Sequence, residues 1–255
     1  MAHLYQADDW DQYKMDWHDP HRHLEPLERE IEVVDAALAK LVEAEILPHI
    51  DYDHERFLAL RKAVCQSFDI PWTAISPRLQ RLIYAVNAIA RPAVTVAVGI
   101  FCGNTFISNA GAACGPGACY SARRLIGLEI RPEEAQRAAR NVAAIDPEGR
   151  AEIIAADGIP FLRAFDQPVD LLYLDADGTG GRGKSIYLDL VEAAHCVLHP
   201  GSLILAHNSV NAAAQLADYL ALVRDPNHFR ESVNIVIDDQ GLEISLCTGA
   251  REREK

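Results

Sequence analysis

The sequence predicts an α/β fold with a mostly parallel seven-stranded sheet, an antiparallel C-terminal hairpin and an N-terminal helical extension. Three observations lead to this fold class. Strand-like runs alternate with helical patterns five times between residues 94 and 223, as in a parallel sheet covered by helices. The first of these strands runs into a glycine turn at Gly99 and Gly103. Two further strand-like runs close the chain around residues 238–241, which carry a hairpin signal.

Helical patterns dominate the chain before the first strand. The first 23 residues are polar and aromatic without a persistent period, and apolar residues then recur at helical spacing. Pro26 suits a first helical turn, and Pro48 ends that helix. We therefore divide the chain into an N-terminal lid and helical extension, residues 1–90, and a sheet-containing domain, residues 91–250. The helices expected in the first part are 25–47, 53–68 and 77–91.

The second part is read from short aliphatic runs and from apolar residues spaced by three or four. Pro132 opens one helix, and His199-Pro200-Gly201 predicts a turn. The strands expected are 94–99, 124–129, 151–156, 169–174, 202–206, 231–237 and 242–247. The helices expected follow Gly103, cover 132–144, pass through Phe161 and Leu162, cover 184–197 and pass through 216–223.

Composition narrows the class of protein. The chain has 255 residues, 49% of them hydrophobic and 24% charged, which is typical of a globular protein. A net charge of −13 without a basic face argues against a nucleic-acid partner. No apolar run approaches the ~20 residues of a membrane span, and the N-terminus lacks a signal-peptide core. Six cysteines without zinc-module spacing suit a reducing compartment, so we expect a cytoplasmic protein.

The glycine turn indicates what kind of cofactor the sheet could bind. A dinucleotide turn needs three glycines in the pattern G-x-G-x-x-G, whereas this turn has only Gly99 and Gly103, with three residues between them. The looser turn lacks the tight helix start that holds a pyrophosphate, so it favours a nucleoside cofactor without one. S-adenosylmethionine fits this description, because it joins a nucleoside to an amino acid and carries no phosphate.

Acidic residues follow three successive strands, where a cofactor would cross the sheet. Glu129 ends the strand after the glycine turn and can accept hydrogen bonds from both ribose hydroxyls. Asp157 is placed to accept from the adenine amino group, and Asp175 lies at the reacting end of the cofactor. A carboxylate at such a position can instead cap a helix or face water, so each one alone leaves both interpretations open.

Five motifs together resemble those of the catechol and caffeoyl-CoA O-methyltransferase family. These are class I S-adenosylmethionine-dependent enzymes with seven-stranded Rossmann-like folds. Residues 99–105 (GIFCGNT) resemble the glycine motif of the family, and residues 128–132 (LEIRP) its ribose-binding motif. Residues 174–177 (LDAD) and 205–208 (LAHN) resemble the two motifs that supply metal ligands. Lys184-Ser-Ile-Tyr187 has the Lys-x-x-Tyr spacing around the catalytic lysine of the family.

The resemblance implies roles for particular residues of an S-adenosylmethionine-binding domain over 91–250. Catalytic roles fall to Lys184, His207 and Asp175, and ligands for a divalent metal would be Asp175, His207 and Asn208. The cofactor-binding residues implied are Gly99, Phe101, Gly103, Thr105, Glu129, Asp157, Gly158 and Asp175.

Three departures from the family pattern leave the metal open. His207 replaces a carboxylate, an insertion at 178–183 separates Asp175 from Lys184, and Ala97 stands where the family has a glutamate near the amino group of the cofactor. One alternative keeps a divalent metal, with His207 favouring a softer ion than Mg²⁺. The other is a metal-free site in which His207 acts as the base.

We therefore expect a transferase that moves methyl from S-adenosylmethionine to a hydroxyl of a small molecule. The alternative is metal-independent use of the 3-amino-3-carboxypropyl arm, by transfer or by cyclisation that releases methylthioadenosine. A non-catalytic binding protein and a nicotinamide oxidoreductase are further alternatives. Aromatic residues within 1–23 could close over the sulfonium as a lid. The helix at 25–47 could instead pack in a homodimer.

Overall fold

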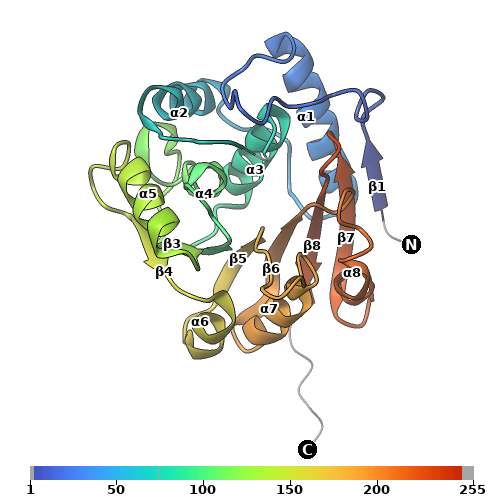
Figure 1. The fold of residues 1–255 in the computed structure, drawn as a ribbon. Coiled ribbons are helices and arrows are strands. Elements are labelled where there is room, and N and C mark those ends of the chain that lie inside the picture. The colour runs from blue at the N-terminus through green and yellow to red at the C-terminus, as the bar shows by residue number, and fades with distance from the viewer. Residues whose placement is uncertain (1–2, 74, 249–255) are drawn as a thin grey trace, which may run out of the picture.

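The computed structural model describes residues 3–73 and 75–248, and these form one sheet covered by helices on both faces (Figure 1). The sheet in the described residues has eight strands in the order β1-β7-β8-β6-β5-β2-β3-β4. The strands are β1 His3–Gln6, β2 Val94–Val98, β3 Arg124–Glu129, β4 Ala151–Ala155, β5 Val169–Leu174, β6 Leu198–His207, β7 Phe229–Val236 and β8 Leu242–Cys247. The helices are α1 Leu27–Glu43, α2 His54–Ser67, α3 Pro77–Ala90, α4 Asn104–Ala110, α5 Pro132–Ala143, α6 Gly158–Ala164, α7 Ile186–Ala194 and α8 Ala217–Val223, with a short 3₁₀ helix at Gly115–Gly117.

The strand directions confirm the predicted fold class. Strands β2 to β6 pair in parallel, and β8 pairs antiparallel with both β6 and β7, as expected for a C-terminal hairpin. Strand β2 lies at the centre, between β3 and β5. Because the chain first builds outward from β2 to β4 and then returns to β5, the direction of winding reverses beside β2. A crevice opens at such a switch point, at the carboxyl ends of the strands.

An eighth strand was not predicted. Residues His3–Gln6 form β1, which pairs in parallel with β7 at the edge of the sheet. This strand has four residues and one neighbour, and its side chains are half-buried or exposed. A short edge strand needs no buried apolar run, so its sequence carries little signal. The polar and aromatic N-terminal segment therefore begins as part of the sheet.

Side chains alternate across the sheet into two cores. Val94, Val96 and Val98 point to the face covered by α6, α7 and α8. Ala97 points to the opposite face, which α1 to α5 cover, and shares its core with Leu38 of α1 and Leu82 of α3. Figure 1 shows α1, α2 and α3 together at the top of the molecule and α6, α7 and α8 at the bottom.

Element ends follow local chemistry. The Ser76 hydroxyl accepts a hydrogen bond from the Leu79 amide at 3.2 Å, and Pro77 occupies the first turn of α3. Helix α1 ends at Glu43, before the Pro48 that marked its predicted end, because Glu45 takes a left-handed conformation with φ 54°. The turn predicted at His199-Pro200-Gly201 is wrong. These residues lie inside β6, where a register shift opposite β5 accommodates them.

None of the helices in the described part of the chain has the length and hydrophobicity needed to cross a bilayer.

Candidate active site

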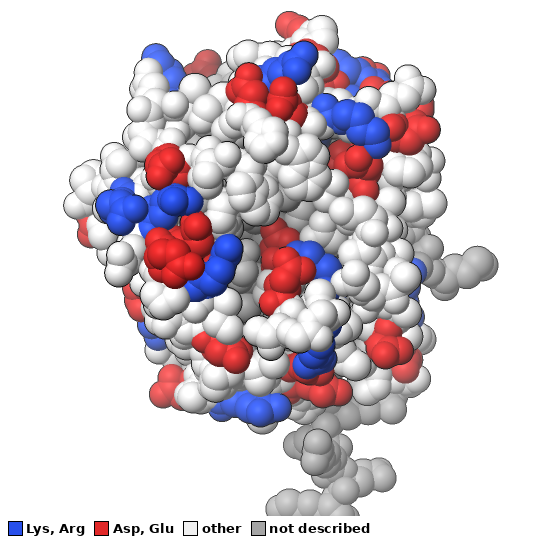
Figure 2. Space-filling view, viewed as in Figure 1, with Lys and Arg blue, Asp and Glu red and all other residues white. Residues whose placement is uncertain are grey.

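A cleft of about 600 Å³ opens at the carboxyl ends of the parallel strands. Figure 2 shows a hollow in the middle of this face, with acidic and basic atoms at its bottom. The loops after β2 to β6 form most of its wall, and Trp17, Trp72 and Gln240 complete it. The predicted site residues that line it are Gly99, Phe101, Thr105, Glu129, Asp157, Gly158, Asp175, Lys184 and Asn208. Two predicted site residues, Gly103 and His207, lie outside this lining.

The two glycines of the turn have different structural roles. Gly99 has φ 84°, and a Cβ there would lie 2.5 Å from the backbone of Ala176. Its lack of a side chain therefore lets the loop after β2 pack against the loop after β5. Gly103, with φ 91°, precedes α4, and a Cβ there would lie 3.2 Å from the Cβ of Ala138 in α5. Gly99 thus shapes the cleft, whereas Gly103 positions α4 against α5.

Glu129 is held firmly at the end of β3. Its side chain is buried, with 4% of the residue exposed, yet it lines the cleft. One carboxylate oxygen accepts from the Phe101 amide at 2.8 Å, and the other accepts from the amide and Nε of Arg131, both at 3.1 Å. A carboxylate offers about four acceptor positions. Glu129 can therefore accept from a ligand hydroxyl while its two backbone contacts keep it oriented.

Asp157 both caps a helix and lines the cleft. Its Oδ1 accepts from the Ile159 amide at 2.9 Å at the start of α6, so the helix-capping interpretation of this residue is correct. Capping uses one oxygen and leaves the other available to a ligand. Gly158 follows, and a Cβ there would lie 2.5 Å from Cγ1 of Val98. This close packing brings α6 against the end of β2 beside the cleft.

Asp175 and Lys184 form an ion pair at the opposite end of the cleft. Lys184 Nζ donates to Asp175 Oδ1 at 2.8 Å and to the Asp175 backbone oxygen at 3.0 Å. His207 Nδ1 lies 3.2 Å from the same Oδ1. Burial by itself would raise the pKa of Asp175, but the charges of Lys184 and His207 outweigh it and lower that pKa to about 2. Asp175 is therefore ionised at neutral pH and binds the lysine as a carboxylate.

His207 and Asn208 differ in their access to the cleft. His207 is fully buried at the end of β6, and neither of its ring nitrogens has a hydrogen-bond partner among the described residues. Asn208 lines the cleft, and its Nδ2 donates to Gln240 Oε1 at 3.0 Å. His207 thus contacts Asp175 from behind, whereas Asn208 faces the cleft itself.

The residues at this end do not fit a divalent metal. Of the three ligands that the family resemblance implied, only Asp175 is a carboxylate, and its Oδ1 already bonds the ammonium of Lys184. That ammonium lies where a cation would compete for the same oxygen. Across residues 3–73 and 75–248, no three His, Cys, Asp or Glu side chains converge to hold an ion. Hard cations need several oxygen ligands with negative charge, which this set does not supply.

Two further groups of side chains complete the cleft: an aromatic wall of Trp17, Trp72 and Phe101, and an amide cluster of Asn208, Asn211 and Gln240. The ring of Trp72 lies 4.7 Å from that of Phe101 and 6.2 Å from that of Trp17, measured between centroids. Asn211 Nδ2 donates to Gln240 Oε1 at 2.7 Å. Sequence reasoning missed Trp72, Asn211 and Gln240. A large aromatic residue in the Pro71-Trp72 connection between helices was the one signal available for the wall.

Comparison with known proteins supports the resemblance to methyltransferases. Residues 96–209 match the model of a methyltransferase domain family. This stretch contains every site residue predicted from the sequence. The resemblance to methyltransferases read from the motifs is thus confirmed. A search of curated proteins finds no match.

Solved structures share the fold. An O-methyltransferase TomG from Streptomyces achromogenes, in complex with SAM (S-adenosylmethionine), has TM-score 0.56 and 21% identity, over 88% of this chain and 100% of that one. The methyltransferase PaMTH1 of Podospora anserina, bound to SAH (S-adenosylhomocysteine), has TM-score 0.58 and 15% identity, over 82% and 95%. An O-methyltransferase from Bacillus cereus, in complex with SAH, has TM-score 0.55 and 15% identity, over 85% and 99%. These likenesses confirm the Rossmann-like methyltransferase fold.

Proposed function

We propose that this chain binds S-adenosylmethionine in the cleft and transfers its methyl group to a hydroxyl oxygen of a small molecule. One observation carries the proposal: four residues from four strand ends, Gly99, Glu129, Asp157 and Asp175, line a single cleft inside a methyltransferase domain. Structures of this fold have been solved with SAM or SAH bound, which supports the same cofactor here. The comparisons give no support to the alternative that uses the 3-amino-3-carboxypropyl arm.

The cofactor lies across the strand ends in this proposal. Glu129 accepts hydrogen bonds from the ribose hydroxyls, in place of the contact with the half-exposed side chain of Arg131. Asp157 accepts from the adenine amino group with the oxygen that does not cap α6. Phe101, Gly158 and Thr105 form the remaining contacts with the cofactor. Gly103 supports them indirectly, by holding α4 in place.

Lys184 is proposed to take the place that a metal would have. Its ammonium is fixed by Asp175 and lies 3.6 Å from Oδ2 of Asp177, on the wall of the cleft. From there it donates a hydrogen bond to the acceptor oxygen and stabilises the negative charge that develops as the hydroxyl loses its proton. The oxygen attacks the methyl carbon while its proton passes to solvent water, and the carbon–sulfur bond breaks with its electron pair left on sulfur. The products are the methyl ether, S-adenosylhomocysteine and a solvated proton. His207 orients Asp175 from behind, because it is buried and does not line the cleft.

The charges of the cleft favour a neutral acceptor. Arg131 and Lys184 are the basic side chains on the described cleft wall, and each is paired with a carboxylate, Glu129 or Asp175. In the proposed complex Lys184 keeps its pairing with Asp175, and Arg131 lies beside Glu129 at the ribose end of the cleft, so neither is placed to bind a phosphate or a coenzyme A group of the acceptor. The amide cluster of Asn208, Asn211 and Gln240 suits hydroxyl or carbonyl groups. We therefore propose a small, uncharged hydroxylated substrate.

The surroundings of the cleft complete the proposal. Residues 1–90 form the lid and helical extension that supply acceptor-binding surface, and residues 91–250 form the cofactor-binding domain. The six free cysteines support a cytoplasmic location, and the net charge of −13 supports a protein without a nucleic-acid partner. We also propose small-molecule metabolism as its setting and a homodimer as its assembly. Light scattering on the purified protein tests the assembly.

Binding and product analysis test the function. Titration calorimetry with S-adenosylmethionine and with NAD distinguishes the two classes of cofactor. We expect a heat of binding with S-adenosylmethionine and none with NAD. The protein is then incubated with S-adenosylmethionine and a panel of catechols and other small phenols, and the released nucleoside is identified by mass. S-adenosylhomocysteine supports the proposal. Release of methylthioadenosine would show instead that the aminocarboxypropyl arm reacts. Binding of NAD but not of S-adenosylmethionine would exclude S-adenosylmethionine as the cofactor.

A further inference from the structure

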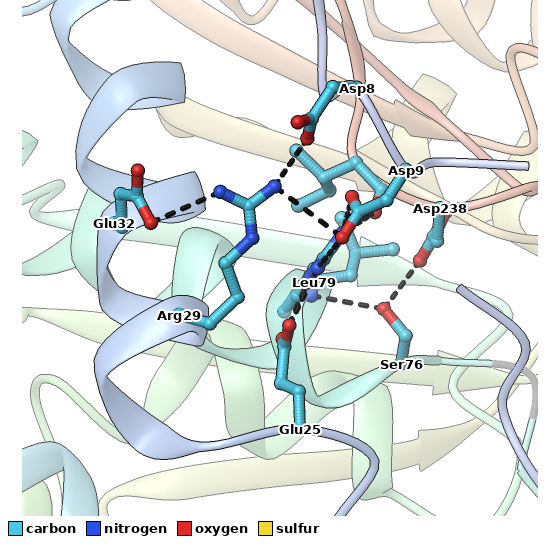
Figure 3. Close-up of polar contacts among 10 residues, drawn as sticks. Asp8, Asp9, Glu25, Arg29, Glu32, Ser76, Leu79 and Asp238 are labelled. Carbon is cyan, nitrogen blue, oxygen red and sulfur yellow. Dashed lines mark hydrogen bonds and ion pairs between the residues drawn. The ribbon is translucent and has the colours of Figure 1, made fainter. Parts of the chain in front are cut away.

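A single buried guanidinium joins two distant parts of the N-terminal segment. Arg78, in the first turn of α3, is fully buried. Its terminal nitrogens donate to both carboxylate oxygens of Asp9, each at 2.8 Å. Its Nε and one terminal nitrogen donate to the two oxygens of Glu25, at 2.8 and 2.6 Å. Figure 3 shows Asp9 and Glu25 pointing toward one another from different stretches of backbone.

Two further contacts fix the guanidinium itself. One terminal nitrogen donates to the backbone oxygen of Ile237 at 3.0 Å, at the start of the β7–β8 turn. The guanidinium carbon lies 3.9 Å from the centre of the Tyr13 ring, a cation–π contact. Two bidentate carboxylates, a carbonyl and a ring thus surround Arg78. Such an arrangement fixes the positions of its partners, because a planar guanidinium can donate to a carboxylate in only a few orientations.

Asp9 and Glu25 flank a loop, residues 10–24, which we name the N-terminal loop. Both of these residues bind the same side chain, so neither end of the loop can open unless Arg78 loses a partner. Compact loops with joined ends are common carriers of function. Its middle reaches the cleft, where Trp17 lines the wall and its backbone oxygen accepts from the Thr73 amide at 3.0 Å. The N-terminal loop therefore brings one aromatic side chain to the cofactor cleft.

Contacts beside Arg78 connect the start of α3 to the β7–β8 turn, which forms another part of the cleft wall. The Ser76 hydroxyl donates to Asp238, and the other oxygen of Asp238 accepts from the amides of Gln240 and Gly241, each at 3.0 Å. Gln240 belongs to the amide cluster of the cleft. Figure 3 shows Ser76 and Asp238 beside the contacts of Asp9 and Glu25. The start of α3 thus holds two parts of the cleft, the N-terminal loop and the β7–β8 turn.

We propose that Arg78 is a positioning residue, which holds the N-terminal loop as a closed lid so that Trp17 covers the bound cofactor. Stability alone is a weak reason for such a cluster, since an apolar side chain of similar volume often replaces a buried ion pair without loss. What an apolar side chain cannot do is bind two carboxylates at once. The lid role rests on the proposed function, because it assumes that S-adenosylmethionine occupies the cleft.

A double-mutant cycle tests this role. Arg78→Met, Trp17→Ala and the double variant are compared with the parent by the Kd for S-adenosylmethionine. Arg78→Met alone is expected to raise Kd about tenfold, and in the Trp17→Ala background it is expected to change Kd less than about twofold. Arg124→Met, which breaks an ion pair with Glu152 between β3 and β4, is the matched control and should leave Kd unchanged. The same factor for Arg78→Met in both backgrounds would show that it does not act through Trp17.

We name the pairing of Arg78 with Asp9 and Glu25 the clamp. A second variant and a readout without cofactor test the clamp by itself. Glu25→Gln leaves Arg78 paired with Asp9 and weakens only one end of the loop. Limited trypsin digestion at Lys14 and Arg22 is expected to speed up about tenfold, with hydrogen exchange in α3 unchanged. Equal digestion rates in parent and variant would overturn the clamp whether or not the cleft binds S-adenosylmethionine. If the parent does not bind S-adenosylmethionine while digestion responds as expected, the proposed function fails and the clamp stands.

Discussion

Lys184 Nζ lies 2.8 Å from Oδ1 of Asp175, where an enzyme of the resembling family would hold a divalent metal. This ion pair fixes the ammonium group of Lys184 at the wall of the cleft. The surroundings agree with that role, because the third group on the same oxygen, His207, is an imidazole and not a second carboxylate. We therefore propose that the cleft binds its cofactor as in the resembling family but uses an ammonium group at the reacting end.

Replacing the lysine tests this charge. Lys184→Met should lower kcat by ~10²–10³, the usual loss when one donor to a developing oxyanion is removed. The Kd for S-adenosylmethionine should change less than about threefold, because the lysine acts on the acceptor oxygen. Lys184→Arg keeps the charge and should retain more activity than the methionine variant. Steady-state kinetics and calorimetry on the three proteins measure both effects, and full activity of Lys184→Met would remove the lysine from the mechanism.

Treatment with a chelator tests whether methyl transfer depends on a divalent metal in addition to the charge of Lys184. Methyl transfer by the parent should change less than about twofold after treatment with excess EDTA, because the donor set around Asp175 does not fit a divalent ion. Activity and bound metal are measured before and after treatment. A chelator that abolishes activity, with recovery on adding Mg²⁺ or Mn²⁺, would restore the metal-dependent alternative.

Glu129 should account for much of the cofactor affinity. Glu129→Ala removes a charged acceptor for the ribose hydroxyls, so binding should weaken by ~1–3 kcal/mol, about five- to 150-fold in Kd. Glu152→Ala is the control, because Glu152 lies on the neighbouring strand β4 and binds Arg124 outside the cleft. Calorimetry with S-adenosylmethionine compares the three proteins. Equal affinities would show that the ribose lies elsewhere.

Two glycines with positive φ allow the stability cost of backbone strain to be distinguished from that of a steric collision. Gly149 has φ 63°, and no described atom would lie within 4 Å of a Cβ at this position, so Gly149→Ala should cost about 1 kcal/mol from conformation alone. Gly99→Ala adds a collision at 2.5 Å with the backbone of Ala176, which cannot move without shifting the end of β5. It should lower the free energy of unfolding by clearly more than Gly149→Ala. Denaturant unfolding of both variants checks the order, and equal losses would contradict the close approach.

The clamp predicts a dependence of stability on pH. The hydrogen bond from Arg78, with its charge and that of Arg29, lowers the pKa of Asp9 from 3.8 to about 2 against the opposing effect of burial. Between these values the unfolded state binds more protons, so Asp9 stabilises the fold above about pH 4 and this contribution is lost as pH falls toward about 2. Asp9→Asn should therefore lose less stability than the parent between about pH 5 and about pH 2.5. Urea unfolding at both pH values measures it, and identical losses would argue against the pairing.

The sheet and the acids at its edge could be predicted because both leave local signals. A buried strand reads as a short aliphatic run, and parallel strands bring residues such as Glu129 and Asp175 to one edge. The short edge strand β1 leaves no such signal, since it buries little and pairs with one neighbour. The turn predicted at Pro200 failed for a related reason, because a register shift within β6 depends on its partner strand.

The clamp could not be predicted, because it depends on contacts between distant residues. Arg78 follows Asp9 by 69 residues and precedes Ile237 by 159. An arginine in the first turn of a helix normally faces water, so nothing in the local pattern marks Arg78 as buried. Trp72 and Gln240 are likewise loop residues that reach the cleft only once the chain has folded. The sequence thus indicates the cofactor end of the cleft much better than its lid and acceptor end.

A crystal structure of the protein with S-adenosylhomocysteine would show whether the cofactor lies across the strand ends. We expect the ribose hydroxyls within hydrogen-bond distance of Glu129, the adenine beside Asp157 and the sulfur facing Lys184. A ligand whose ribose lies away from Glu129, or a cleft that stays empty at saturating S-adenosylhomocysteine, would contradict this expectation.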